Sequence, residues 1–282
     1  MPEPSYPAPL DRLLTLGKAW GSQPWPDYLA LGLTPEHVPD LIRMATDVAL
    51  NEADSESSEV WAPGHAWRAL ALLHAAEAAA PLTQLFRRID ENDDEFVGED
   101  LPKAFGILGP AAIPVLMAYL ADDSHGLWAR VAAAHSLAYM GQRYPKAREG
   151  SVAALAGQLG LFAQQDPMLN GSLVAYLVDL KATEAADVLE QAFRAGDVDE
   201  SVAGGWEHVQ TDLGLKAEMD RLIRVPGPPG AVHELANPAG KRRPQPKPSP
   251  QSVVEARLAQ ALREAELEID TGPKRKHHRK RK

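Results

Sequence analysis

Four apolar segments recur along the chain at a nearly constant interval. Aligned with one another, they place Leu82, Val115, Val152 and Val188 at equivalent positions, with successive spacings of 33, 37 and 36 residues. Such a spacing accommodates two helices of about 12 to 15 residues each and two turns. One helical hairpin cannot cover its own apolar face, so hairpins of this kind are stabilised by stacking on their neighbours. The recurrence therefore predicts an α-solenoid of about four helical hairpins.

The composition favours helices throughout the chain. Ala and Leu dominate, few stretches alternate apolar and polar residues, and the β-branched and aromatic runs typical of strands are missing. The segment Ala66–Leu73 is apolar nearly all the way round a helix, so neighbours must cover it on several sides. We therefore expect an all-α fold.

Two helix-start signals stand near the N-terminus. Asp11 is placed to cap a helix over Arg12–Trp20. Thr34-Pro35-Glu36 combines a capping hydroxyl, a Pro in the first turn and an acid near the positive end of a helix. The apolar residues of the helix after this second signal would be buried. They are Val38, Leu41, Ile42 and Ala45.

The composition also indicates the compartment. The chain has no cysteine, which excludes disulfides, thiol nucleophiles and thiolate metal sites and favours a reducing environment. No charged start followed by an apolar run opens the sequence, and no stretch approaches the roughly 18 apolar residues of a membrane span. We therefore expect a soluble, unprocessed, cytoplasmic protein without membrane contact. The Ala-rich composition suggests a bacterium with GC-rich DNA.

Charge is divided unevenly between the body and the C-terminal end. The formal net charge is −10, yet residues 237–282 hold 13 Lys and Arg against 5 Asp and Glu, a local excess of +8. The other 236 residues therefore carry −18. A body this acidic is a poor ligand for a nucleic-acid backbone, because that affinity comes from clustered Lys and Arg.

The sequence divides into five predicted regions. Between Pro226 and Pro250 there are eight prolines in 25 residues, which is typical of a linker without a core of its own. Ser252-Val253-Val254-Glu255 has the spacing of a capping box before an amphipathic pattern. The regions are an N-terminal helical cap at 1–60, the repeat solenoid at 61–225, a disordered Pro-rich linker at 226–250, an amphipathic helix at 251–270 and a disordered basic tail at 271–282.

The motifs of common active sites and cofactor sites are missing. The nine histidines include no HExxH, and no phosphate-binding glycine loop or nucleophile elbow follows a strand. We predict no catalytic, cofactor-binding or metal-ligating residue. The acidic run Asp90–Glu95 raises the alternative of calcium binding, but it lacks the Gly and the spaced Glu of an EF-hand loop. A solvated acidic turn is the favoured interpretation.

Histidines and tryptophans on the expected helices have a structural interpretation. His65, His74 and His135 are expected on inner helices, where a neutral imidazole commonly donates to a backbone carbonyl. Trp67 and Trp128 stand near the starts of expected first helices and are interpreted as packing anchors. The tryptophan expected to be the more exposed is Trp206, after Gly204-Gly205.

Two stretches carry a family resemblance. Leu108-Gly109-Pro110-Ala111-Ala112-Ile113-Pro114-Val115-Leu116 has the form of a turn between repeat helices, and Arg130–Gly141 looks like the first helix of a repeat. On these residues the segment from Trp61 to Leu215 resembles bacterial HEAT-like repeat proteins, which have an armadillo-type superhelical fold. The resemblance is a pattern of small and apolar positions, so it implies fold far more than function.

The end of the chain is the one predicted site. Seven basic residues and two histidines fill nine positions, and such a run binds polyanions through counterion release. Docking on an acidic protein surface, folding back onto the acidic body and a role in solubility alone remain alternatives. The predicted polyanion-binding residues are Lys274, Arg275, Lys276, Arg279, Lys280, Arg281 and Lys282.

The leading functional hypothesis is a non-catalytic scaffold or adaptor. The expected curved inner surface, lined by the second helix of each pair, would hold a segment of a protein partner. The alternative is a nucleic-acid-associated protein that uses the basic tail. By fold analogy alone, the resemblance also admits two enzymes, a HEAT-like alkylpurine DNA glycosylase and a bilin lyase.

Overall fold

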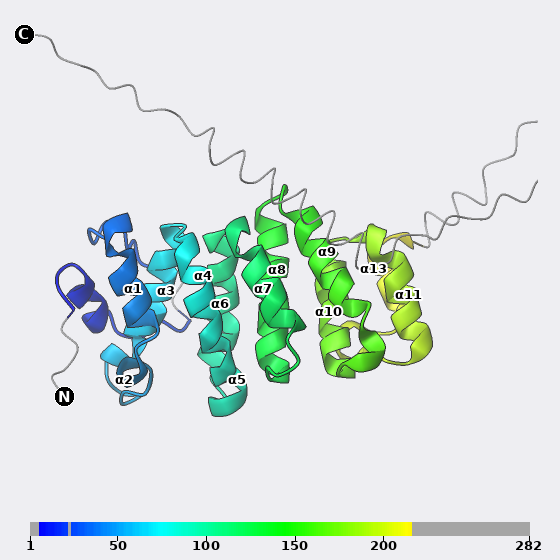
Figure 1. Cartoon of the computed structure of the whole chain (residues 1–282), viewed down its shortest axis with the longest axis horizontal. Helices are drawn as coiled ribbons and strands as arrows, with labels where there is room; N and C mark the ends of the chain where they lie inside the picture. Colours follow the sequence, from blue (N-terminus) through cyan, green and yellow to red (C-terminus); the bar gives the residue numbers. More distant parts are fainter. Residues whose placement is uncertain (1–5, 22–23, 216–282) are drawn as a thin grey trace, which may run out of the picture.

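The computed structural model describes residues 6–21 and 24–215, and these residues form helices and turns without a β-strand (Figure 1). The all-α prediction is therefore confirmed for this part of the chain. The predicted linker at 226–250, helix at 251–270 and tail at 271–282 lie outside the described residues, as does the end of the predicted repeat region, 216–225.

The N-terminal region contains short helices. A 3-10 helix spans Leu10–Thr15 and lacks a side-chain cap, so the prediction that Asp11 caps a longer helix was wrong. The second start signal is confirmed, because Thr34 caps a 3-10 turn at Pro35–His37 that leads into α1, Val38–Ala45. Of the four residues expected to be buried there, Ile42 alone is only partly buried. The short helix α2, Val48–Asn51, and a 3-10 turn, Glu59–Trp61, follow.

The rest of the described chain alternates between two sets of helices joined by short turns, several of them 3-10. The bounds are α3 Ala62–Leu72, α4 Ala79–Thr83, α5 Arg87–Asn92, α6 Glu95–Leu108, α7 Ile113–Ala121, α8 Leu127–Arg143, α9 Arg148–Leu159, α10 Pro167–Asp179, α11 Ala186–Ala195, α12 Glu200–Ala203 and α13 Trp206–Asp212.

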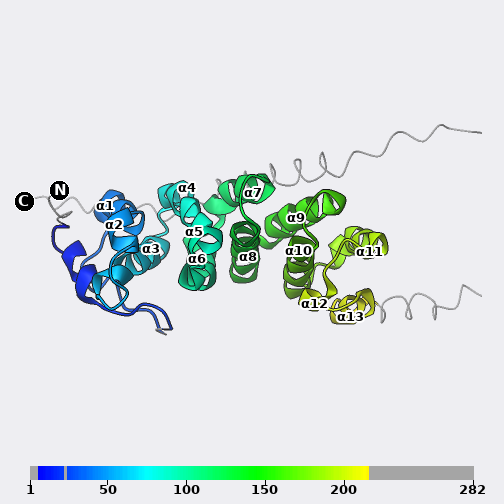
Figure 2. The same cartoon turned by 90° about the horizontal axis from the view of Figure 1, so that it is seen from below.

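These helices lie in two layers, which Figure 2 shows end-on. Layer A holds α3, α6, α8, α10 and α12, and each of these contacts the next. Layer B holds α1, α4, α7, α9 and α11, which also contact one another in order. The four residues aligned by sequence spacing lie on successive helices of layer B. They are Leu82 on α4, Val115 on α7, Val152 on α9 and Val188 on α11.

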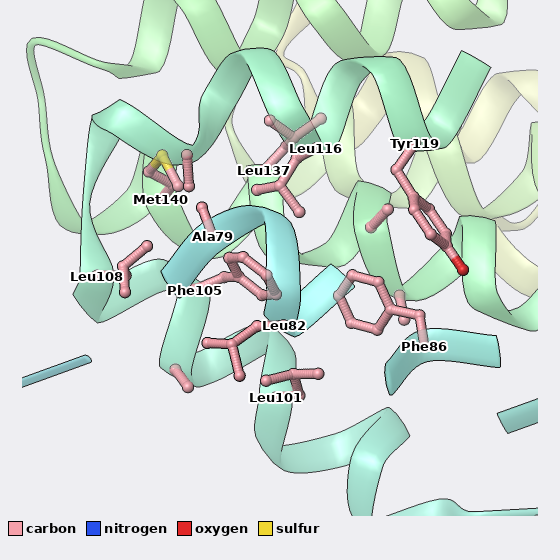
Figure 3. Packing of buried hydrophobic residues seen from close by; sticks show 14 of the residues in the cluster. Ala79, Leu82, Phe86, Leu101, Phe105, Leu108, Leu116, Tyr119, Leu137 and Met140 are labelled. Carbon is pink, nitrogen blue, oxygen red and sulfur yellow. The ribbon is translucent and has the colours of Figure 1, made fainter. Parts of the chain in front are cut away.

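The core lies between the layers and runs along the whole row (Figure 3). Around its centre, the Phe86 ring lies 5.4 Å from the Phe105 ring and 5.5 Å from the Tyr119 ring. Leu101, Leu116, Leu137 and Met140 fill the space around these rings and are fully buried. Burial of each such side chain contributes about 1.5–3 kcal/mol, so the core joins helices far apart in the sequence.

No single helix among the described residues is long and apolar enough to cross a bilayer. The pair Glu95–Leu108 and Pro110–Ala121 passes that test together, by length and composition, but it is bent by 113°. The apolar residues of this pair face the core between the layers, which accounts for its composition.

Glycines allow close contacts between successive helices of layer A. A Cβ atom built on Gly64 of α3 would lie 2.6 Å from the Phe96 ring of α6. One built on Gly106 of α6 would lie 2.7 Å from the Tyr139 Cβ of α8. These separations leave no room for a methyl group, so glycine sets the spacing of the helices at both contacts.

Substitution of two glycines in the same helix tests this packing. Gly106→Ala is expected to destabilise the protein by about 1–3 kcal/mol, because the new methyl group overlaps Tyr139. Gly98→Ala is the matched control, since its nearest neighbour would be Ile89 at 3.8 Å and Ala is the better helix former. Urea unfolding of both variants would measure the difference. Equal stabilities would contradict the packing argument.

Candidate functional site

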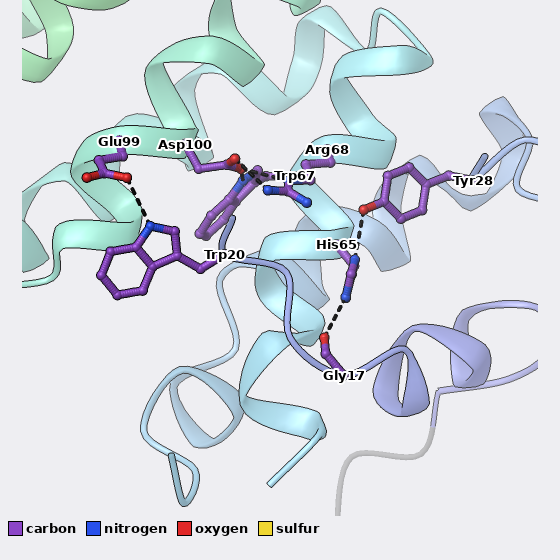
Figure 4. A network of polar contacts seen from close by, with 8 residues as sticks. All are labelled: Gly17, Trp20, Tyr28, His65, Trp67, Arg68, Glu99 and Asp100. Atoms are coloured by element: carbon purple, nitrogen blue, oxygen red, sulfur yellow. Dashed lines mark hydrogen bonds and ion pairs between the residues drawn. The ribbon is translucent and has the colours of Figure 1, made fainter. Parts of the chain in front are cut away.

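The outward side of layer A is covered at α3 by residues 6–21 and 24–33, which we call the N-terminal segment (Figures 2 and 4). The His65 Nε2 atom lies 2.9 Å from the carbonyl oxygen of Gly17, and the Tyr28 hydroxyl lies 2.7 Å from His65 Nδ1. A carbonyl only accepts, so His65 Nε2 carries the proton and Nδ1 accepts from Tyr28. Farther along, Trp20 Nε1 donates to Glu99 on α6 over 2.9 Å. The segment is thus held on α3 and α6 by directed hydrogen bonds.

A buried ion pair lies beneath the N-terminal segment (Figure 4). Arg68 on α3 binds both carboxylate oxygens of Asp100 on α6, with Nε at 2.9 Å and Nη2 at 2.6 Å. Trp67 Nε1 donates to the same carboxylate over 2.8 Å, and the Trp25 ring lies 4.8 Å from the Arg68 guanidinium. A bidentate pair with further hydrogen bonds offsets the cost of burying both charges.

Burial also governs the titration of His65. Burial is the main cause that lowers the pKa of His65 from its ordinary value, while the hydrogen bond to Gly17 acts in the opposite direction. The neutral ring agrees with its hydrogen bonds, because one nitrogen donates and the other accepts. The prediction of a neutral His65 that donates to a backbone carbonyl is confirmed.

The corresponding side of α8 and α10 is open. Trp128, Val131, His135 and Tyr139 follow one another at helical spacing along α8, and each is partly or largely exposed. The His135 ring stacks on Tyr139 at 4.4 Å and on Tyr176 of α10 at 4.9 Å. These five residues form what we call the open face.

His135 on the open face matches His65 under the N-terminal segment. The two residues are 70 positions apart, which is also the separation of Leu82 from Val152 in the sequence alignment. Both lie on layer A helices, and burial lowers the pKa of both imidazoles. For His135, burial and the nearby charge of Lys103 lower the pKa to about 4. In the part of the chain that the structure describes, no hydrogen bond to the His135 ring is found.

A second feature is a cavity of about 280 Å³ in the N-terminal part of the described chain, lined by residues of the turn after α2 and of the starts of α3 and α6. Trp20, Trp61, Trp67 and Phe96 line it, together with polar residues from the turn before α6. We call this the aromatic pocket. It brings together the N-terminal segment, the turn after α2 and the starts of α3 and α6.

The acidic run Asp90–Glu95 borders this pocket and is partly used for capping. Asp90 accepts from the backbone nitrogens of Trp128 and Ala129 at the start of α8, and Asp94 caps α6 and pairs with Arg88. Within the described ranges, no group of three or more His, Asp or Glu side chains is arranged to hold a metal ion. The described residues therefore include no arranged set of calcium ligands at Asp90–Glu95.

Other sequence interpretations have mixed outcomes. Trp67 is 1 % exposed, as expected of a packing anchor, but Trp128 is 47 % exposed, so that interpretation was wrong for Trp128. Trp206 is only partly buried and packs against Phe193 at 5.6 Å, whereas Trp128 is exposed. The expectation that Trp206 would be the more exposed tryptophan was therefore wrong. His74 lies in the turn after α3 rather than on a helix, with Nδ1 3.3 Å from the carbonyl oxygen of Leu108.

The predicted polyanion-binding residues, Lys274 to Lys282, lie outside the described residues. Comparison with known proteins found no matching family model, no matching curated protein and no matching solved structure. The HEAT-like resemblance thus rests on the residues of this chain. The equivalence of His65 and His135 was present in the spacing, but nothing in the sequence showed which of them is covered.

Removing the carboxylate of Asp100 tests how much the buried ion pair beneath the N-terminal segment contributes to stability. Asp100→Asn leaves the Arg68 guanidinium buried without its counter-charge, and we expect a loss of about 3–5 kcal/mol in the free energy of unfolding. Asp40→Asn removes an exposed partner of Arg43 and should cost less than about 1 kcal/mol. Chemical denaturation would measure both. A similar cost for the two variants would contradict the buried-pair argument.

The lowered pKa of His135 predicts a pH dependence of stability. Its pKa is about 4 in the folded chain and about 6.5 when unfolded, so between these values the unfolded chain binds more protons. The contribution is complete above pH 6.5 and decreases as pH falls towards 4. His135→Phe keeps an aromatic ring but cannot titrate, so its stability should fall less between pH 7.5 and 5. Identical slopes for the variant and the parent chain would contradict the shift.

Proposed function

We propose that this chain is a non-catalytic scaffold, a HEAT-like α-solenoid that binds a segment of a protein partner on the open face of layer A. The observation that carries the proposal is a comparison between two parts of the same layer. The N-terminal segment occupies the outward side of α3, whereas the matching side of α8 and α10 presents the exposed Trp128 beside three partly buried rings, those of His135, Tyr139 and Tyr176.

The solenoid part of the proposal is supported by the order of helix contacts. Each helix in a layer contacts the next helix of the same layer. Along the chain, a layer A helix is followed by a layer B helix four times, as α3 and α4, α6 and α7, α8 and α9, and α10 and α11. Arrays of this kind stack each repeat mainly on its neighbours and leave an extended surface on either side. The proposed cap is the N-terminal region before α3.

The chemistry of the partner follows from the segment already bound to α3. Gly17 offers a backbone carbonyl to His65, and Tyr28 and Trp25 place rings against His65 and Arg68. On the open face, neutral His135 offers a hydrogen-bond donor between two tyrosine rings. An extended peptide with an aromatic side chain and a free carbonyl would fit these groups.

The charge of the body favours a protein partner for this face. Residues 6–21 and 24–215 carry 13 Lys and Arg against 30 Asp and Glu. Such a surface does not supply the counterion release that gives nucleic-acid affinity. The exposed rings lie on layer A, the first helices of the pairs, so the proposed surface differs from the second-helix surface expected from the sequence.

Peptide selection tests the proposal. Peptides would be selected from a random display library against the full chain, and their affinity measured by fluorescence anisotropy. Trp128→Ala should weaken binding at least tenfold, because exposed tryptophans at the centre of an interface commonly contribute more than about 1.4 kcal/mol. Trp128 is largely exposed, so this change should leave stability within about 1 kcal/mol.

The matched control is Gln191→Ala, an exposed residue of α11 on the opposite layer. Its peptide affinities should equal those of the parent chain. If the selected peptides bind Trp128→Ala and the parent equally well, the open face is not the binding surface. If selection yields no binder at all, the scaffold proposal loses its support.

A further inference from the structure

Four aromatic rings line the aromatic pocket, beside a smaller number of aliphatic side chains. The edge of Trp61 meets Phe96 at 5.4 Å, and Trp20 approaches the same ring at 6.5 Å. All three rings are only partly buried and line the cavity. The faces of aromatic rings carry negative electrostatic potential, so a cavity with such walls favours a cation over an anion.

The two stretches of chain that border the pocket are rich in Asp and Glu. Residues 52–59 contain four Asp and Glu, and residues 89–102 contain seven, with no Lys or Arg in either stretch. Arg88 also lines the pocket, but its guanidinium is paired with Asp94 over 2.9 Å. Asp93 and Glu95 line the same cavity and are exposed. The pocket therefore keeps an excess of negative charge after its one cation is paired.

The same end of the molecule already uses its rings to hold cations. The Lys18 Nζ atom lies 6.0 Å from the centre of the Trp20 ring, which itself lines the pocket. The Arg68 guanidinium lies 5.8 Å from the Phe96 ring on the side of the buried ion pair. Ring walls together with nearby carboxylates are the features that recognise an ammonium or a guanidinium group.

We propose that the aromatic pocket is a binding site for a Lys or Arg side chain and that the basic segment 274–282 of this same chain supplies it. This segment holds seven Lys and Arg in nine residues, whereas the described residues hold 13 Lys and Arg against 30 Asp and Glu. The site lies apart from the open face, so the proposal stands independently of the proposed function.

The length of the chain permits the contact. Leu215 ends the described residues beside α13, at the opposite end of the row from the pocket. Helices that pack side by side are 8–10 Å apart, so the four steps from α12, the helix before α13, back to α3 span about 40 Å. The 59 positions from Leu215 to Lys274 reach about 190 Å when fully extended. The tether therefore exceeds the distance several times over.

Disulfide cross-linking in the full chain tests the contact, because the chain has no cysteine of its own. One variant would combine Thr271→Cys with Ser55→Cys, an exposed residue that lines the pocket. The comparison variant would combine Thr271→Cys with Gln191→Cys on α11, a helix at the same end of the row as α13, after which the tether begins. The rate of disulfide formation in monomers, after addition of oxidised glutathione, would be followed on non-reducing gels.

A docked tail and a tail without a docking site predict opposite orders for the two cross-linking rates. A tether without a docking site meets groups near its origin most often, so it would favour Gln191→Cys. Docking in the pocket should make cross-linking at Ser55→Cys faster, by on the order of tenfold. Equal rates, or a faster reaction at Gln191→Cys, would overturn the proposal. Cross-links found only between two chains would overturn it as well.

Neutral substitutions identify the interaction. Asp93→Asn with Glu95→Gln removes two charges that line the pocket and should abolish the preference for Ser55→Cys. Glu149→Gln with Asp187→Asn removes two exposed charges elsewhere and should leave the preference unchanged. If cross-linking still favours Ser55→Cys after the changes at Asp93 and Glu95, the pocket does not hold the basic segment. The same conclusion follows if the control changes at Glu149 and Asp187 also abolish the preference. Circular dichroism would confirm that all variants fold.

Discussion

Close contact between successive layer A helices is the constraint on which both candidate sites depend. Gly64 lets Phe96 approach α3, and Phe96 in turn forms a wall of the aromatic pocket. Gly106 lets Tyr139 lie against α6, and the Tyr139 ring stacks on His135 in the open face. The glycines therefore do more than save space in the core. At Gly64 the close approach lets the Phe96 ring of α6 meet the Trp67 ring of α3 at 5.0 Å, and at Gly106 it seats Tyr139 against α6.

The N-terminal segment shows what the outward side of layer A can bind. Its Trp20 indole donates to Glu99, its Tyr28 hydroxyl donates to His65, and the Gly17 carbonyl accepts from the same histidine. Its contacts therefore combine aromatic rings with directed hydrogen bonds. His135 lies 70 positions after His65 and stacks on two partly buried tyrosines, and no segment of the described chain covers it in the way that residues 6–21 and 24–33 cover His65. In the solenoid that we propose, such a surface would recur along the array, and the N-terminal segment would cover it at α3 alone.

The sequence predicted those features that depend on local pattern. Helical periodicity and spacing identified the all-α fold, and they aligned Leu82, Val115, Val152 and Val188, which lie on successive layer B helices. Exposure was not predictable in the same way, because it depends on which helix the N-terminal segment covers. The aromatic pocket joins residues as distant as Trp20 and Phe96, and no spacing rule relates them. His65 and His135 both lie on layer A helices, and residues 6–21 and 24–33 cover the first of them but not the second.

The two sites are connected through one helix. Phe96, Glu99 and Lys103 follow at helical spacing along α6, so they point to one side of it, between the aromatic pocket and His135. Glu99 holds Trp20 at the pocket, while the charge of Lys103 acts on His135. A cation in the pocket would lie at the acidic end of this stripe, and a neutral peptide would fit its other end. The proposed site for a basic side chain and the proposed peptide site would therefore lie at differently charged ends of one helix.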